Sequence, residues 1–162
     1  MLSQGDRAPQ FELPDLGGGV QSLARTLEGG PALVIFWKPE CNTCHLAFPY
    51  YQRLVQAYPG GGWQLLAVSQ EGRSESEAFA QEYGLTFPVL LEGDGWPVSR
   101  DYDPDATPTA FLIRADGLIE LVSAGFAKDD LNEISRRLAE RLGVAPQTVA
   151  PADDGNPRLR PG

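Results

Sequence analysis

The sequence of 162 residues is poor in the side chains that most often build covalent or metal-based structure: it has two cysteines, one histidine and one methionine. Two cysteines are too few for the disulfide framework of a small secreted domain. One histidine, His45, and one methionine, Met1, also leave few ligands for a haem or a histidine-rich metal site. The fold must therefore depend on ordinary hydrophobic packing, for which a chain of this length suffices.

Basic residues are scarce as well, with 13 Lys and Arg against 22 Asp and Glu and a formal net charge of −9. Phosphate binding depends on clustered Lys and Arg, so this balance argues against nucleic acid and against anionic membrane surfaces as partners. No apolar run approaches the roughly 18 residues of a membrane span. The opening MLSQGDRAPQF lacks the basic start and apolar stretch of a secretory signal. We expect a cytoplasmic protein as the chain stands, or an extracytoplasmic one if a signal or anchor has been removed.

The apolar residues that are present follow the periods of an α/β domain. Continuous apolar runs of strand length indicate strands that are buried on both faces. Apolar residues that recur every three or four positions indicate helices, and Asp116-Gly117 between two apolar runs is a hairpin signal. The expected strands are 11–13, 20–22, 32–37, 63–69, 87–91, 109–114 and 118–124, and the expected helices are 42–58, 74–83, 97–102 and 128–142.

The order of these elements predicts how they are connected. A crossover helix joins strands 32–37 and 63–69, which makes the two strands parallel, whereas the last two strands form an antiparallel hairpin. We therefore predict a mixed central sheet with helices on both faces and an N-terminal β-hairpin extension. After Gly143 the chain loses apolar periodicity and becomes rich in Pro and Asp. The sequence thus predicts one domain over residues 1–143 and a disordered tail over residues 144–162.

Both cysteines and the histidine lie in one stretch, E-C-N-T-C-H, at residues 40–45. Cys41 falls just after a predicted buried strand and just before the first turn of a helix. Free N–H groups and the helix dipole stabilise an anion there, so we expect the pKa of Cys41 to be lowered and Cys41 to be the nucleophile. Cys44 is one helical turn further on the same face and can resolve a mixed disulfide by attacking Cys41.

The same string satisfies two other motifs. C-x-x-C-H is the attachment site of a c-type haem, but the chain offers no second histidine, and its only methionine is Met1. A closed zinc site needs four ligands, and Cys41, Cys44 and His45 supply three. We therefore expect neither a metal nor an organic cofactor, and we interpret His45 as a helix residue beside a redox-active dithiol.

Several features together resemble the thioredoxin fold: the strand ALVIFW, the C-x-x-C pair, Pro49 five residues after the second cysteine, and Thr107-Pro108 directly before the strand TAFLI. The opening GDRAPQFELPDLGG and the segment PTAFLIRADGLI are most similar to thiol–disulfide oxidoreductases of the TlpA/ResA type, which are related to the AhpC/TSA peroxiredoxins. The resemblance covers roughly residues 5–142.

This resemblance implies an enzyme that exchanges disulfides with protein substrates and with an electron donor or acceptor protein. By the same resemblance Cys41 attacks and Cys44 resolves, while Thr107 and Pro108, joined by a cis bond, contact the substrate. Trp37 packs behind the site. We expect a monomer.

Three positions depart from the pattern of these relatives. Glu40 stands where many of them carry Trp, and Ile35 stands where thioredoxin has a buried acid. Ala47 replaces a glutamate that is frequent in the TlpA type. Such acids are proposed to move protons to and from the resolving thiol. Whether Glu40 takes over this task, and in which direction the enzyme runs, stays open at this point.

Two other functions remain as alternatives. A peroxiredoxin-like peroxidase would place Pro seven and Thr or Ser three residues before its reactive cysteine, and here these positions hold Val34 and Lys38. The chain could also be a binding module that keeps the thioredoxin fold and uses its cysteines slowly.

Overall fold

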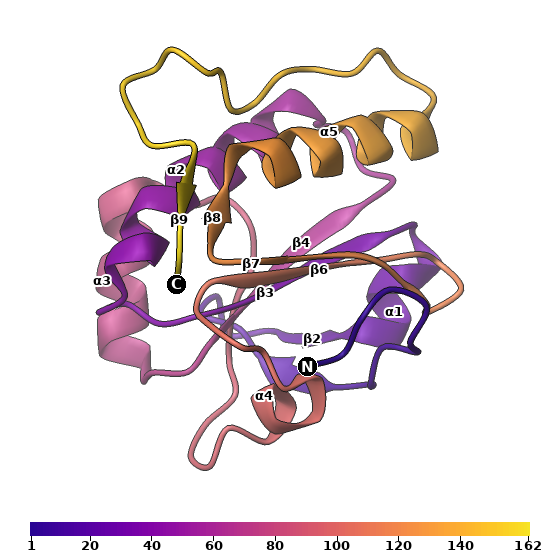
Figure 1. Ribbon diagram of the computed structural model, residues 1–162. Coiled ribbons are helices and arrows are strands. Elements are labelled where there is room, and N and C mark those ends of the chain that lie inside the picture. The colour runs from indigo at the N-terminus through magenta and orange to yellow at the C-terminus, as the bar shows by residue number, and fades with distance from the viewer.

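Five strands in the order β5-β4-β3-β6-β7 form the central sheet of the computed structural model, which describes residues 1–162 (Figure 1). β3 pairs in parallel with β4, and β4 pairs in parallel with β5, whereas β3–β6 and β6–β7 are antiparallel. The predicted mixed sheet is therefore confirmed. The strands are β3 (Ala32–Trp37), β4 (Gln64–Ser69), β5 (Val89–Leu91), β6 (Thr109–Ile113) and β7 (Ile119–Ala124).

Helices cover both faces of this sheet (Figure 1). One face packs against α2 (Asn42–Ala57), α3 (Arg73–Tyr83) and α5 (Lys128–Leu142). The other packs against α1 (Leu23–Glu28), α4 (Pro97–Tyr102) and the N-terminal hairpin of β1 (Glu12–Pro14) and β2 (Val20–Ser22). None of the helices is both long enough and apolar enough to cross a lipid bilayer.

Strand β3 shows why its sequence is an unbroken apolar run. Its side chains alternate between the two faces, so Leu33, Ile35 and Trp37 enter the core under α2, and Ala32, Val34 and Phe36 enter the core on the other side. All six residues are buried. Because β3 is the middle strand, neither face can be polar.

The start of α3 differs from the sequence-based expectation. The sequence predicts this helix over residues 74–83. The helix instead begins at Arg73, with Gly72 at its N-cap and no side-chain cap. Two short elements within residues 1–143, α1 and the strand β8 (Phe126–Ala127), were not predicted from the sequence.

The structure also corrects the expectation of a disordered tail over 144–162. Val149 and Ala150 are buried in the core beside α2 and α5, and the strand β9 (Leu159–Arg160) pairs antiparallel with β8. The Asn132 side chain on α5 accepts hydrogen bonds from the N–H groups of Val149 and Ala150. Side chains of the domain thus form hydrogen bonds with backbone groups of the tail. Because these partners lie outside the tail, the tail sequence shows no periodic pattern.

Candidate active site

Cys41 lies at the point where the middle of the sheet meets a helix. β3 ends at Trp37, and four residues later Cys41 forms the N-cap of α2. Its Sγ accepts a hydrogen bond from the Cys44 N–H at 3.1 Å, in the way that a serine or aspartate would cap the helix. The local fold therefore places the sulfur where the unpaired N–H groups of the first helical turn converge.

These contacts lower the pKa of Cys41 to about 5. The main cause is a hydrogen bond from the side chain of Cys44, supported by the side chain of Thr107 and by the N–H groups of Cys44 and Thr43, and together they outweigh the effect of burial. Cys41 is therefore a thiolate at neutral pH, which is the nucleophilic form of cysteine.

Cys44 has the opposite character. Its side chain is fully buried, and burial, followed by the neighbouring Cys41, raises its pKa. The backbone N–H of Lys38 points to this sulfur and acts in the opposite direction. Both cysteines are free thiols in the structure, so the described form is the dithiol, with one sulfur ionised and its partner protonated.

Thr107 and Pro108 lie directly against this pair, although they are far from it in the sequence. The Thr107–Pro108 peptide bond is cis, as the family resemblance implies. The Sγ of Cys41 lies 3.1 Å from the carbonyl oxygen of Thr107. The loop before β6 therefore forms one wall of the site, with backbone groups beside the reactive sulfur.

An aromatic cluster supports α2 from behind. Trp37 is fully buried, and its ring centroid lies 4.7 Å from that of Phe48 on α2 and 4.5 Å from that of Phe79 on α3. Its Nε1 has no hydrogen-bond partner. Pro49 lies within α2, which continues through it as one helix.

Glu40 is exposed and forms a pair that the sequence did not indicate. A hydrogen bond with Glu40 is the main cause that raises the pKa of Glu71, in the loop after β4. Neither glutamate is among the groups that set the pKa of Cys41 or Cys44. The two carboxyl groups come together only because the ends of β3 and β4 are neighbours in the sheet, so spacing along the chain could not reveal the pair.

His45 is partly packed and holds the loop that leads to Cys41. Its Nε2 lies 2.7 Å from the Pro39 carbonyl and its Nδ1 lies 2.5 Å from the Tyr83 hydroxyl. Nε2–H therefore donates to the carbonyl, which has no proton of its own. No three His, Cys, Asp or Glu side chains meet as a metal site.

Two further features of the site were not predicted from the sequence. Thr43, between the two cysteines, donates a hydrogen bond from its hydroxyl to the carbonyl of Pro161 at 2.8 Å. The neighbouring Gly162 lies against the backbone of Thr107. The end of the described chain therefore reaches both walls of the site.

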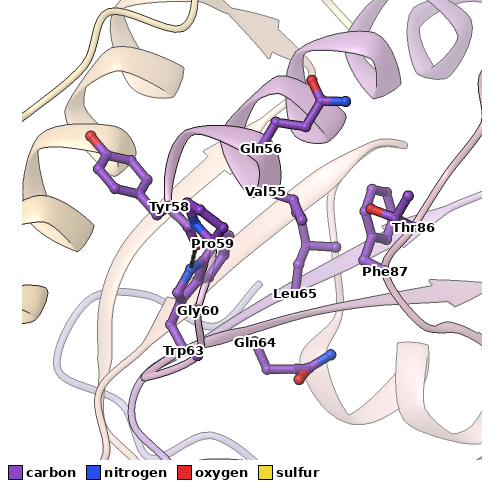
Figure 2. Close-up of a pocket in the computed structure, with 11 residues that line it drawn as sticks. Val55, Gln56, Tyr58, Pro59, Gly60, Trp63, Gln64, Leu65, Thr86 and Phe87 are labelled. Atoms are coloured by element: carbon purple, nitrogen blue, oxygen red, sulfur yellow. Dashed lines mark hydrogen bonds between the residues drawn. The ribbon is translucent and has the colours of Figure 1, made fainter.

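The pocket drawn in Figure 2 is separate from the cysteines. It has a volume of about 390 Å³ and lies between the C-terminal end of α2 and the start of β4, where Tyr58, Trp63 and Phe87 line it. Cys41 and Cys44 lie at the opposite end of the same helix. The reactive sulfurs therefore lie outside this pocket, and Cys41 Sγ is beside the Thr107 carbonyl instead.

Comparison with known proteins gives a consistent result. The model of the AhpC/TSA family matches residues 4–122. The chain is 32% identical over 134 residues to the thiol-disulfide oxidoreductase ResA of Geobacillus thermodenitrificans, with 82% of this chain and 76% of the relative covered. It is 33% identical over 125 residues to ResA of Bacillus subtilis, with 76% and 69% covered.

Solved structures agree with these relatives. A putative thiol:disulfide interchange protein DsbE from Chlorobium tepidum has a TM-score of 0.78 at 28% identity, with 88% of this chain and 100% of that chain covered. A secreted Mycobacterium tuberculosis disulfide oxidoreductase homologous to Escherichia coli DsbE has a TM-score of 0.67 at 27% identity, with 81% and 96% covered.

Proposed function

The chain belongs to the AhpC/TSA family and is a thiol–disulfide oxidoreductase, and we propose that it serves protein substrates with Cys41 as the attacking thiol. The observation that carries this assignment is the asymmetry of the two sulfurs. Cys41 has a pKa of about 5 and is ionised at neutral pH, whereas Cys44 is buried with a raised pKa. Only one of the two is therefore ready to attack a disulfide.

The reaction proceeds by two exchanges. The Cys41 thiolate attacks one sulfur of a substrate disulfide, the substrate S–S bond breaks, and the other substrate sulfur leaves as a thiolate that takes up a proton. Cys44 then loses its proton and attacks Cys41 Sγ in the mixed disulfide. This second step releases the remaining substrate thiol and leaves a Cys41–Cys44 disulfide, so the pair loses two electrons to the substrate. A donor protein restores the dithiol by the reverse steps.

The resolving step is the slower one in this proposal. Cys44 must ionise before it attacks, and no carboxylate is among the groups that set its pKa. Ile35 and Ala47 occupy the positions where acids of related proteins would lie. Glu40 interacts with Glu71 instead, so we propose that it does not replace the missing acid. The Lys38 N–H, followed by Thr107, favours the Cys44 thiolate.

Thr107 and Pro108 are proposed to contact the substrate. The Thr107 carbonyl already touches Cys41 Sγ, so a polypeptide whose cysteine reaches Cys41 has to run along this loop. Trp37 and Pro49 act as supporting residues, Trp37 through its contacts with Phe48 and Phe79. We propose that the chain acts as a monomer, because the surface beside Cys41 has to admit a second protein.

Reduction of insulin disulfides in the presence of dithiothreitol tests this function. Wild-type protein should accelerate precipitation of the insulin B chain above the rate with dithiothreitol alone, and Cys41→Ser should abolish the acceleration. Cys44→Ser should instead accumulate mixed disulfides through Cys41, which mass spectrometry detects. Wild-type activity equal to that of Cys41→Ser would contradict an enzyme and favour a binding module. Consumption of peroxide at a rate above that of insulin reduction would favour the peroxidase.

A further inference from the structure

The last residues of the described chain lie between the two walls of the active site. The Pro161 carbonyl accepts a hydrogen bond from the Thr43 hydroxyl in the first turn of α2. Gly162 lies so close to the loop before β6 that an added Cβ would be 2.4 Å from the Thr107 carbonyl oxygen. That oxygen also faces Cys41 Sγ. Cys41 is only 9% exposed, although it is the sulfur that has to meet a substrate.

The segment reaches this position as an added strand. β9 pairs antiparallel with β8, with Arg160 opposite Phe126 and Leu159 opposite Ala127, and the Lys128 N–H donates to the Arg158 carbonyl at 2.9 Å. Figure 1 shows β9 beside β8 at the end of the long C-terminal connection. Addition of a strand to a short open edge is a common way for proteins to hold an extended peptide.

The edge that receives β9 is continuous with the substrate-contacting loop. The Gly125 N–H, just before β8, donates to the Pro108 carbonyl at 2.7 Å. A Cβ at Gly125 would lie 2.8 Å from the Arg160 carbonyl oxygen, so the absence of a side chain lets the two backbones approach. A polypeptide paired with β8 is thereby led directly to Thr107 and Cys41.

Side chains upstream hold the segment on this path. Lys128 is almost fully buried and forms an ion pair with Asp154 at 2.5 Å, and the Asn156 amide donates to the Tyr50 hydroxyl at 2.8 Å. Arg158 forms an ion pair with Asp129 at 2.6 Å on the surface. The segment is therefore tethered close to the groove, where its effective concentration is high.

From these contacts we propose that residues 157–162, which we call the tail segment, occupy the groove that an extended substrate segment enters and compete with protein substrates for Cys41. The inference rests on the proposed function, since it assumes that protein segments reach Cys41 along Thr107. The tail segment, PRLRPG, contains no cysteine and cannot react. A substrate has to displace it.

The tail segment also shows what the groove accepts. It is an extended backbone with a residue lacking a side chain beside Thr107 and a guanidinium facing the Asp129 carboxylate. A partner of the same chemistry, a protein with an exposed, basic, extended segment around its cysteine, displaces it most readily.

A substitution within the full chain tests this competition. Gly162→Leu adds a side chain where a Cβ already collides with the Thr107 carbonyl, and it leaves the cysteines untouched. Ala152→Leu is the matched control, because it adds the same bulk at an exposed position of the same connection. For Gly162→Leu we expect both insulin reduction and alkylation of Cys41 by a polymer-linked maleimide to accelerate roughly three- to tenfold. This gain corresponds to a groove covered for roughly 70 to 90% of the time. Ala152→Leu should stay at the wild-type rates.

A peptide supplies the second arm of the experiment. Synthetic NPRLRPG added to the Gly162→Leu variant should slow insulin reduction back toward the wild-type rate, and a scrambled peptide of the same composition should not. Equal alkylation rates in wild type, Gly162→Leu and Ala152→Leu, or equal effects of the two peptides, would overturn the proposal. If insulin reduction is absent in all three proteins, the proposed function fails, and the alkylation rates still decide whether the tail segment covers Cys41.

Discussion

At the scale of single residues, reactivity depends on how two sulfurs share one proton. Cys44 is the main cause of the low pKa of Cys41, through its hydrogen bond to the Cys41 sulfur, and Cys41 in turn helps to raise the pKa of Cys44. The pKa of about 5 for Cys41 lies between the roughly 7 of thioredoxin and the roughly 3.5 of DsbA. Because a stabilised thiolate favours the reduced pair, we expect a reduction potential between about −270 and about −120 mV.

Removal of the Cys44 side chain should therefore change the titration of Cys41. In Cys44→Ala the donor is lost, and the pKa of Cys41 should rise, although the N–H groups of Thr43 and Cys44 keep it below its ordinary value. Cys44→Ser retains a hydroxyl donor and should give a smaller rise. The pH dependence of iodoacetamide alkylation measures both values, and an unchanged midpoint in Cys44→Ala would contradict the assigned cause.

The Cys41 pKa also fixes how the stability of the reduced protein depends on pH. Its value in the folded state, about 5, is below the ordinary thiol value of 9.0. Folding is therefore favoured by this group at pH values above the ordinary thiol pKa, and the contribution is lost as the pH falls through about 5. Cys41→Ser should have a flatter profile of unfolding free energy between these limits, which guanidinium unfolding at several pH values can measure.

The pKa of Glu71 should depend on Glu40 and not on the two sulfurs. The hydrogen bond with Glu40 raises the pKa of Glu71, so Glu40→Gln should lower the pKa of Glu71 toward its ordinary value. The alkylation midpoint of Cys41 should stay near the wild-type value, because neither glutamate is among the groups that set it. Carboxyl chemical shifts in an NMR titration report the first effect. A shift of the Cys41 midpoint as large as that in Cys44→Ala would contradict this separation.

At the scale of elements, one close contact between turns positions β3 beside β4. Gly30 precedes β3 with a φ of +135°, and a Cβ there would lie 2.0 Å from the carbonyl oxygen of Gly62, just before β4. Gly30→Ala should destabilise the fold by about 3 kcal/mol or more, because both backbone strain and a backbone clash oppose it. The measurement is the free energy of unfolding in guanidinium chloride.

Gly60→Ala separates these two causes. Gly60 also has a positive φ, of +93°, but an added Cβ would have nothing within 4 Å. This variant should lose only the strain contribution, about 1–2 kcal/mol. Equal losses in the two variants would show that the contact between Gly30 and Gly62 does not matter.

The elements that were predictable from the sequence are those whose environment repeats along the chain. β3 is buried on both faces and reads as six apolar residues, and α5 places Leu131, Ile134 and Leu138 in the core on one face. β8 and β9 have two residues each, so no period can reveal them. The tail connection is held by the side chains of Asn132 and Lys128, which belong to α5. The sequence of the connection itself therefore contains no pattern that predicts its fold.

The residues of the active site also differ in whether the sequence could reveal them. Cys41 and Cys44 could be identified from local spacing, because their environment is the turn between one strand and one helix. The family resemblance added Thr107, which the structure brings to within 3.1 Å of Cys41 Sγ. Glu71, Thr43 and Gly162 could not be identified, since each contributes through a contact with a residue that is distant in the sequence.

At the scale of the whole molecule, the C-terminal connection is an added layer over α2 and α5 (Figure 1). The connection forms an ion pair between Asp154 and the almost fully buried Lys128, and the Lys128 ammonium also donates to the Pro151 carbonyl at 2.8 Å. Val149 and Ala150 anchor the connection in the core. The residues before the tail segment are thus bound more firmly than the tail segment itself, which lies exposed in the groove. This gradient lets a substrate displace the end without unfolding the rest.

The ion pair should make attachment of this layer sensitive to acid. Lys128, followed by Tyr50, lowers the pKa of Asp154 below its ordinary value of 3.8. The Asp154 carboxylate therefore stabilises the docked connection at pH values above the ordinary carboxyl pKa of 3.8. This stabilisation decreases as the pH falls below 3.8, and it is lost once the pH has passed the lowered pKa of Asp154. The amides of Val149 and Ala150 should therefore lose protection from hydrogen exchange at about pH 3, relative to pH 6 and after correction for intrinsic rates, before the amides of β3 do.

Replacement of both charges tests whether the ion pair is the cause. Lys128→Met with Asp154→Leu substitutes apolar side chains for the pair, so the acid-dependent loss of protection at Val149 and Ala150 should disappear. Asp154→Asn alone leaves the buried Lys128 ammonium without a countercharge, and it should release the connection at neutral pH. If the double variant retains the acid-dependent loss, another carboxyl group is responsible. If Asp154→Asn exchanges like the wild type at neutral pH, burial of Val149 and Ala150 is sufficient to hold the layer, and the tail segment stays beside Cys41 without the ion pair.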